Sequence, residues 1–98
     1  MKILEVRFKW SGTREEYEIK AIPGANKRKD VAGLLWKIYG FDDEKSMATG
    51  IYLFKDEEAL NKYLVPFKKA TQPEGVSDIE FQIWDLQYKL SKITNAPI

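Results

Sequence analysis

Residues 34–54 read LLWKIYGFDDEKSMATGIYLF, and the rest of the topology is arranged around this stretch. Two runs rich in aliphatic and aromatic residues, Leu34–Tyr39 and Gly50–Phe54, flank the polar segment Phe41–Ser46. Runs of this composition are typical of strands, and a polar connection this short usually joins antiparallel neighbours. The stretch therefore predicts an antiparallel strand pair near the centre of the chain.

The sequence before this pair predicts a strand and then a helix. Apolar and charged side chains alternate through residues 4–10, which is the period of a half-buried strand. Thr13 followed three residues later by Glu16 forms a capping box, which opens a helix. Pro23 and Gly24 interrupt this helix, and we expect a kink or a break there.

The sequence after the pair predicts a second helix and a last strand. Asp56 is a favourable N-cap residue, and the apolar residues between Leu60 and Phe67 follow the spacing of a core-facing helical stripe. Pro66 is expected to end or bend that helix. Beyond a turn, residues 76–86 alternate again and predict the fourth strand.

The predicted element order is therefore β-α-β-β-α-β, the ferredoxin-like split βαβ arrangement of the α+β class. An antiparallel sheet with both helices on one face is the expected architecture. Ninety-eight residues suffice for a single domain, here residues 1–98. The apolar residues of the segment 86–98 predict a C-terminal extension that packs on the body or on a partner subunit.

Composition excludes several classes of function. Sixteen basic against fifteen acidic residues give a net charge of +1, which does not favour a polyanion as the main partner. The absence of Cys and His excludes thiolate nucleophiles, imidazole bases and Cys or His ligands for zinc, iron–sulfur clusters or haem. The sequence shows no signal peptide and no apolar membrane span. We expect a cytoplasmic protein that binds no metal and no membrane.

Strict alternation assigns the strand residues to two faces of the sheet. The residues expected on the helix side are Leu4, Val6, Phe8, Leu34, Trp36, Ile38, Ile79, Phe81 and Ile83. The residues expected on the open side are Glu5, Arg7, Lys9, Leu35, Lys37, Tyr39, Glu80, Gln82 and Trp84. Such a mixture of charged and large aromatic residues fits a solvated surface, a homodimer interface or a nucleic-acid platform.

The nucleic-acid alternative is tested by the third strand. RNA-recognition domains of this topology carry a basic residue and stacking aromatics there. With Phe54 aligned on the last aromatic of that motif, Met47 stands where the basic residue is required, and Thr49 and Ile51 stand where the other aromatics are required. The motif is therefore missing, and we expect no nucleic-acid partner.

Two segments, Gly33–Tyr39 and Gly50–Glu57, resemble the second and third strands of the bacterial YdhR-type monooxygenase family, in the dimeric α+β barrel superfamily. Pro23, ten residues before Gly33, and the tail Leu90–Ile98 resemble the same family. The resemblance implies a homodimer formed through the open sheet faces. It also implies oxygenation of a small aromatic or polyketide-like compound without metal, flavin or other cofactor. The haem-degrading branch of the superfamily uses a His ligand, which this chain lacks.

The candidate site residues follow from this resemblance and from side-chain chemistry. Tyr52 is the candidate catalytic residue, because a phenol can donate a hydrogen bond to a developing enolate oxygen. Trp36 matches the tryptophan of the family's Gly-x-x-Trp-Lys stretch and is a candidate pocket wall. The other candidate pocket residues are Phe8, Trp10, Phe54 and Arg7. Each aromatic residue has core packing as its alternative role, and Arg7 has an ion pair with Glu5 or Glu80.

Asp85 and the acidic run Asp42–Glu44 are further candidates for functional groups. Asp85 would be a candidate base if burial raised its pKa, and its alternative is a turn cap. The run Asp42–Glu44 lacks the spacing of a calcium loop and is expected to be a solvated loop tip. Three functions stay open at this point: oxygenation, non-catalytic small-molecule binding or stress response, and isomerase- or decarboxylase-like proton transfer.

Overall fold

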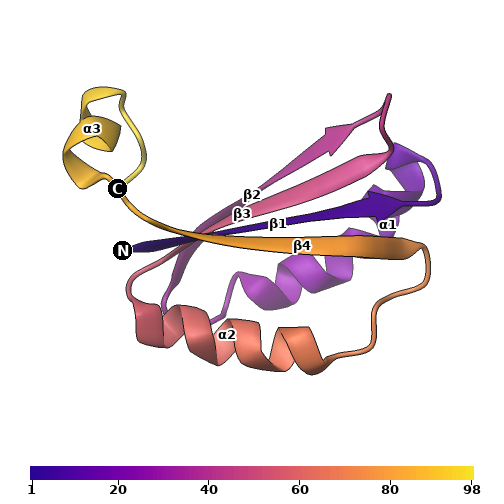
Figure 1. The fold of residues 1–98 in the computed structure, drawn as a ribbon, viewed down its shortest axis with the longest axis horizontal. Helices are drawn as coiled ribbons and strands as arrows, with labels where there is room; N and C mark the ends of the chain where they lie inside the picture. Colours follow the sequence, from indigo (N-terminus) through magenta and orange to yellow (C-terminus); the bar gives the residue numbers. More distant parts are fainter.

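The structure, a computed structural model, describes residues 1–98 and contains one four-stranded antiparallel sheet. Its strands are β1 (Lys2–Trp10), β2 (Leu34–Asp42), β3 (Met47–Phe54) and β4 (Val76–Asp85), in the spatial order β2-β3-β1-β4. Helices α1 (Arg14–Arg28) and α2 (Glu57–Lys69) cover one face, and the short helix α3 (Tyr88–Ile93) lies beyond β4 (Figure 1). The predicted ferredoxin-like arrangement is confirmed.

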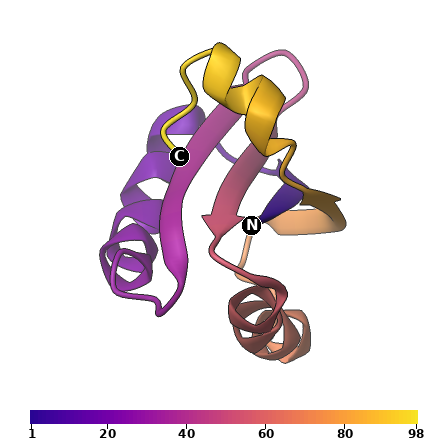
Figure 2. The same ribbon diagram turned by 90° about the vertical axis from the view of Figure 1, so that its left-hand side faces the viewer.

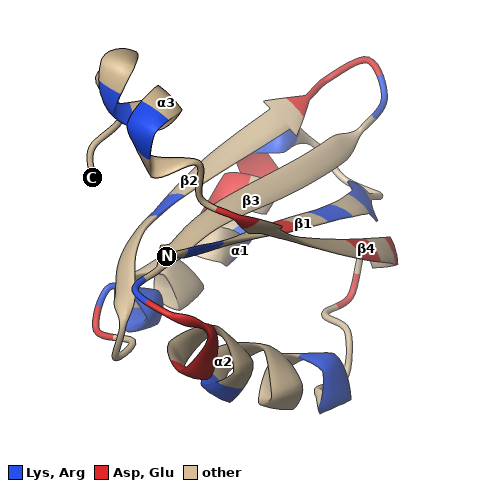
Figure 3. Cartoon of the chain, turned by 60° about the vertical axis from the view of Figure 1, so that its left-hand side comes forward, with Lys and Arg blue, Asp and Glu red and all other residues tan.

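Local signals in the sequence begin both long helices. Thr13 and Glu16 form the predicted capping box at α1, and the Asp56 carboxylate accepts from the Ala59 backbone N–H at 2.8 Å at the start of α2. Figure 3 shows acidic residues at the start of α2 and basic residues at its end, which complements the helix dipole.

Both helices continue past their prolines, so the break expected as one outcome at Pro23 and the end expected as one outcome at Pro66 do not occur. Helix α1 runs through Pro23 and Gly24 to Arg28, and α2 runs past Pro66 to Lys69. Both prolines are exposed. The carbonyl that each proline leaves without a helical donor can therefore bond to water, which lowers the cost of keeping the helix intact.

The packed core lies between the sheet and α2. Its seven buried residues are Leu4, Val6, Tyr52, Phe54, Ala59, Leu60 and Leu64. Helix α1 contributes no buried residue, although it covers the same face of the sheet. The two halves of this layer therefore differ: α2 packs on the strands through three buried residues, whereas α1 contacts them through the half-buried ring of Tyr17, whose centroid lies 5.8 Å from that of Phe8 and 5.7 Å from that of Trp10.

A β-bulge in β2 corrects the predicted facing of that strand. Leu34 pairs with Phe54, but Trp36 pairs with Leu53, so Leu35 is an extra residue on β2. The bulge reverses the alternation. Leu34 packs on the core as expected, whereas Lys37 takes the helix side opposite Tyr52. The same shift moves Tyr39 to the helix side and places Trp36 and Ile38 on the open side.

Gly33 allows the chain to enter β2. Its φ of 81° is unfavourable for residues with a side chain, and a Cβ atom there would collide with Ala59 of α2. The Gly33 carbonyl accepts from the Lys55 backbone N–H at 2.9 Å, which ties the start of β2 to the end of β3. The glycine is thus fixed by a backbone conformation and by a close approach.

The C-terminal segment lies near the chain's N-terminus and beside β2 (Figure 2). The Leu86 backbone N–H donates to the Met1 carbonyl at 3.1 Å, and the Trp36 indole N–H donates to the Pro97 carbonyl at 3.0 Å. Leu90 and Ile93 of α3 stay exposed at 64% and 71%. No helix in the structure has the length and apolar character required to cross a membrane.

Candidate functional site

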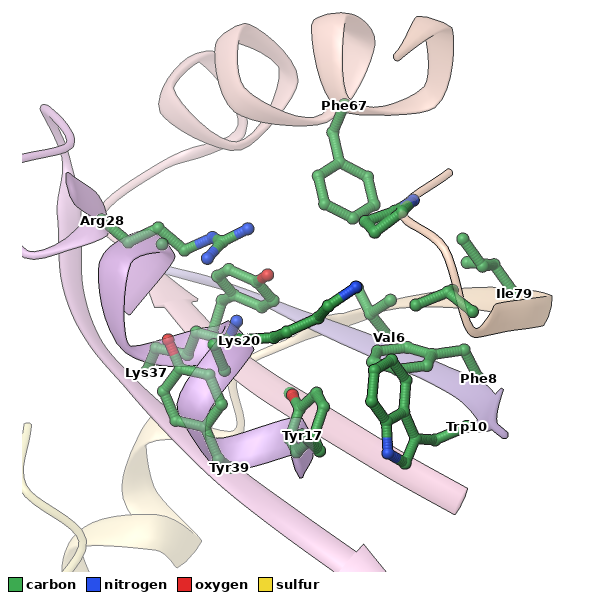
Figure 4. Close-up of a pocket in the computed structure, with 16 residues that line it drawn as sticks. Val6, Phe8, Trp10, Tyr17, Lys20, Arg28, Lys37, Tyr39, Phe67 and Ile79 are labelled. Atoms are coloured by element: carbon green, nitrogen blue, oxygen red, sulfur yellow. The ribbon is translucent and has the colours of Figure 1, made fainter. Parts of the chain in front are cut away.

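A cavity of about 330 Å³ lies on the helix side of the sheet, between the strands and the two long helices. Most of its wall is apolar. The aromatic residues that line it are Phe8, Trp10, Tyr17, Tyr39, Tyr52 and Phe67. Figure 4 shows Phe8, Trp10 and Ile79 at one end of the cavity, and Arg28, Lys37 and Tyr39 at the other. The volume is within the range of small-molecule sites.

One face of α1 forms the outer wall. Tyr17, Ala21, Gly24 and Arg28 all line the cavity, and they recur at the three- and four-residue spacing of one helical face. Two of these residues are small and one is charged, so this face has little apolar volume to place against the sheet. The cavity occupies the space that larger apolar side chains would fill.

The charged residues of the wall are all cationic. Lys20, Arg28 and Lys37 line the cavity, and no Asp or Glu does. The ammonium nitrogen of Lys37 lies 4.0 Å from the ring centroid of Tyr39 and 4.3 Å from that of Tyr52. Neither Arg28 nor Lys37 has a carboxylate within ion-pair distance. The cavity therefore combines aromatic walls with uncompensated positive charge.

Lys37 has an unusual ionisation. Burial, together with the positive charge of Arg28, lowers the pKa of Lys37 to about 7. A lysine in this range is partly neutral at physiological pH and can accept a proton, which an ordinary surface lysine cannot do.

Two glycines make room for these cations. A Cβ atom at Gly24 would lie 2.5 Å from a terminal nitrogen of Arg28, one helical turn later on α1. A Cβ atom at Gly50 would lie 2.7 Å from Cε of Lys37. Arg28 and Lys37 thus lie over positions without a side chain.

A chain of hydrogen bonds connects Arg28 to Tyr52. The Arg28 Nε–H donates to the Tyr63 hydroxyl at 2.9 Å, and the hydroxyls of Tyr63 and Tyr52 are 3.0 Å apart. Burial raises the pKa of Tyr52 far above its ordinary value. Tyr52 therefore keeps its proton and acts as a hydrogen-bond donor rather than as a base.

The sequence-predicted site residues fall into two groups. Phe8, Trp10 and Tyr52 line the cavity together. Phe54 is fully buried in the core, stacked on Tyr52 at a centroid distance of 5.9 Å. Trp36 and Arg7 lie on the open face, away from the cavity.

Trp36 and Arg7 make contacts on the open face that hold other parts of the chain. Trp36 donates to the C-terminal segment through its indole N–H. Arg7 makes the ion pairs weighed as its alternative role, with Glu80 at 3.1 Å and Glu5 at 3.8 Å. The open face thus holds Arg7 in a cross-strand charge network.

The lining residues that sequence reasoning missed include all the cationic residues and two tyrosines: Tyr17, Lys20, Arg28, Lys37 and Tyr39. Arg28 lies near the end of α1, on the helical face that begins with Tyr17. Lys37 and Tyr39 had been placed on the open face. The doublet Leu34-Leu35, which breaks strict alternation, was the available signal for the bulge that reorients them.

The acidic candidates have structural roles. Asp85 is exposed and paired with Lys2, and this hydrogen bond lowers the pKa of Asp85, so the raised-pKa base is ruled out. The Asp42 carboxylate accepts from the backbone N–H groups of Glu44 and Lys45 in the hairpin loop. Asp43 pairs with Arg14 at the start of α1. No cluster of three or more His, Cys, Asp or Glu residues has the geometry to hold a metal ion.

Comparison with known proteins supports the family and the fold. The family model described as "Putative mono-oxygenase ydhR" matches residues 3–97. The structure is similar to SnoaB, a cofactor-independent oxygenase from Streptomyces nogalater, with 17% identity, a TM-score of 0.66, and coverage of 88% of this chain and 93% of SnoaB.

A second similar structure is a "putative antibiotic biosynthesis monooxygenase" from Deinococcus radiodurans. It is 11% identical, has a TM-score of 0.64, and the match covers 88% of this chain and 92% of the other. A search of curated proteins gave no match.

Proposed function

Because the chain belongs to the ydhR mono-oxygenase family, we propose that it is a cofactor-independent monooxygenase for a small aromatic or polyketide-like compound. The observation that carries this proposal is the cavity under α1, whose aromatic walls enclose about 330 Å³ and whose charges are all positive. A planar compound that reacts as an anion fits such a site. The oxygenase SnoaB, whose fold this chain shares, supports the same chemistry.

Tyr52 is the proposed catalytic residue. Its hydroxyl stays protonated and is connected through Tyr63 to the permanent charge of Arg28. When Tyr63 donates to Tyr52, the Tyr52 hydrogen is free to bond to a substrate oxygen on which negative charge develops. Phe8 and Trp10 would hold the rings of the substrate and exclude water.

We further propose that the chain forms a homodimer through its open sheet face. Ile38 and Trp84 on this face are 56% and 52% exposed, and the apolar Leu90 and Ile93 of α3 are also uncovered. Together they provide apolar surface of the kind that interfaces bury. The C-terminal extension 86–98 would then pack on the body through Trp36 and on the partner through α3.

The first experiment combines solution mass with oxygen consumption. Light scattering gives the mass, and dioxygen uptake is followed with a panel of anthrones, quinols and acidic phenols without added metal or flavin. We expect a dimer that consumes dioxygen. Tyr52→Phe is expected to lower kcat by about 10²–10³-fold, the usual effect of removing one hydrogen-bond donor to an oxyanion.

Tyr88→Phe is the matched control, because Tyr88 is an exposed tyrosine of α3 outside the cavity. A dimer without oxygen uptake on the whole panel would contradict the oxygenase and favour the alternative, a non-catalytic small-molecule-binding or stress-response dimer. A stable monomer would contradict the proposed interface.

A further inference from the structure

We propose that Arg28 and Lys37 form an anion site at one end of the cavity, which binds the ionised oxygen of a planar aromatic acid, and that Lys37 accepts the proton of that acid. The inference rests on the proposed function for the location of the site and deepens it in two respects. It names the substrate class, a phenol or enol with an acidic hydroxyl, and it assigns a proton acceptor.

Arg28 and Lys37 have no carboxylate partner to balance their charge. Arg28 and Lys37 are half-buried, and the only polar side-chain partner of either is the Tyr63 hydroxyl, which accepts from Arg28 at 2.9 Å. Partly buried cations are normally paired with carboxylates, because withdrawal from water is costly for a charge. An anionic ligand would supply the counter-charge that the protein omits.

The side chains of Arg28 and Lys37 extend over positions where the neighbouring residue is a glycine. Side chains at Gly24 and Gly50 would occupy the positions of the Arg28 guanidinium and of Cε of Lys37, respectively. Both cations belong to the same wall, one from α1 and one from β2. The bulge at Leu35 is what brings Lys37 to this side. The bulge sets the side on which Lys37 lies, and the two glycines leave the present positions of both side-chain ends open.

The titratable groups around Lys37 come from four elements of the fold. Helix α1 presents Tyr17, Lys20 and Arg28, strands β2 and β3 present Tyr39 and Tyr52, and α2 presents Tyr63 behind Tyr52. None is a carboxylate, so nothing in the wall holds the proton on the Lys37 amine. The pKa of about 7 agrees with this geometry. Arg28 keeps its charge and attracts the anion in either state of Lys37.

The shape of the cavity orients the ligand. Phe8 and Trp10 lie at the end opposite Arg28 and Lys37 (Figure 4). The ring of an aromatic acid would contact these side chains, where the one cation is Lys20, 5.9 Å from the Trp10 ring centroid, and direct its hydroxyl toward the two cations Arg28 and Lys37. On binding, the O–H bond of the acid breaks and an N–H bond forms on the neutral Lys37 amine. The products are a phenolate or enolate and an ammonium group, and no electrons are transferred.

The test uses 4-nitrophenol, because its phenolate absorbs visible light and its neutral form does not. The probe is titrated with protein in the absence of dioxygen, at pH values around its own pKa, and the phenolate fraction of the bound probe is measured. We expect a larger phenolate fraction in the bound probe than in the free probe. Lys37→Met should reduce this excess to the part that Arg28 alone maintains, and weaken phenolate binding by roughly tenfold or more, as expected for a hydrogen bond to a charged group.

Two further variants complete the design. Arg28→Met keeps an apolar stem and should also weaken phenolate binding. Lys62→Met removes an exposed lysine of α2 that pairs with Glu58 at 3.4 Å, and it should bind like the wild type. A bound probe with the same phenolate fraction as the free probe, or an unchanged fraction in Lys37→Met, would overturn the inference.

The result is separable from the proposed function. If the bound probe is ionised and no compound of the panel consumes dioxygen, the anion site stands and the oxygenase is contradicted. If dioxygen is consumed but the probe binds in its neutral form, the oxygenase stands and the role of Lys37 is contradicted.

Discussion

Helices α1 and α2 cover the same face of the same sheet, but they do so in different ways. Helix α2 buries Ala59, Leu60 and Leu64 against the strands, whereas α1 buries nothing. The face that α1 turns to the sheet carries small and cationic residues in place of an aliphatic stripe. Helix α2 thus supplies the buried apolar side chains of this layer, and α1 forms the outer wall of the cavity.

The largest effect is expected on the α2 side. Leu64→Ala leaves a void in a core where Leu64 is 4% exposed, and should lower the free energy of unfolding by about 2–5 kcal/mol, measured by urea denaturation. Ile19→Ala on α1, where the side chain is 71% exposed, should change it by less than about 0.5 kcal/mol. Equal losses at the two positions would contradict the difference between the helices.

The next effect is the pH dependence that Lys37 imposes on stability. Its pKa is about 7 in the folded protein and 10.5 in its ordinary state, so the unfolded chain binds more protons between these values. Stability should therefore rise with pH in this window. Lys37→Met should be more stable than the wild type below pH 7, and the difference should shrink as the pH approaches 10.5.

Denaturation at a series of pH values measures this difference directly. Lys62→Met is the control, because this lysine is exposed on α2 and should give a difference from the wild type without that pH dependence. A constant advantage of Lys37→Met at all pH values would mean that Lys37 is not desolvated in the cavity.

Filling the cavity is expected to have the smallest effect on the free energy of unfolding. It is also expected to abolish binding of a ligand in the cavity. Ala21→Leu adds apolar volume to the face of α1 that lines the cavity. We expect a gain of about 0.5–2 kcal/mol in the free energy of unfolding, as for other cavity-filling substitutions, together with loss of 4-nitrophenol binding. Unaltered binding by a stable Ala21→Leu variant would place the ligand elsewhere.

The order and type of the elements could be predicted from the sequence because their signals are local. Alternation in residues 4–10, the capping box at Thr13 and the N-cap Asp56 each depend on neighbouring residues only, and the structure contains all of them. Of the outcomes expected at the two prolines, a break at Pro23 and an end at Pro66 are wrong, because exposure of these prolines lets water satisfy the carbonyls that they leave free.

The candidate site could be predicted only in part. Phe8 and Trp10 follow the unbroken alternation of β1, Tyr52 is a candidate because of the chemistry of its phenol, and all three line the cavity. Lys37 and Tyr39 follow the bulge at Leu35, which reverses the sides of β2. One extra residue within a strand reverses the facing of every later residue of that strand.

By itself, the sequence determined the ferredoxin-like order of elements, the two helix starts and the aromatic residues of β1 and β3. Only the tertiary structure decided that α1 contacts the sheet through Tyr17 and leaves a cavity beyond it, and that Arg28 and Lys37 both line this cavity. The physical reason is that capping and periodicity act within a few residues of chain. The placement of Arg28 and Lys37 in one cavity wall involves a bulge, two glycines and the packing of a helix against a sheet, which join residues far apart in the chain.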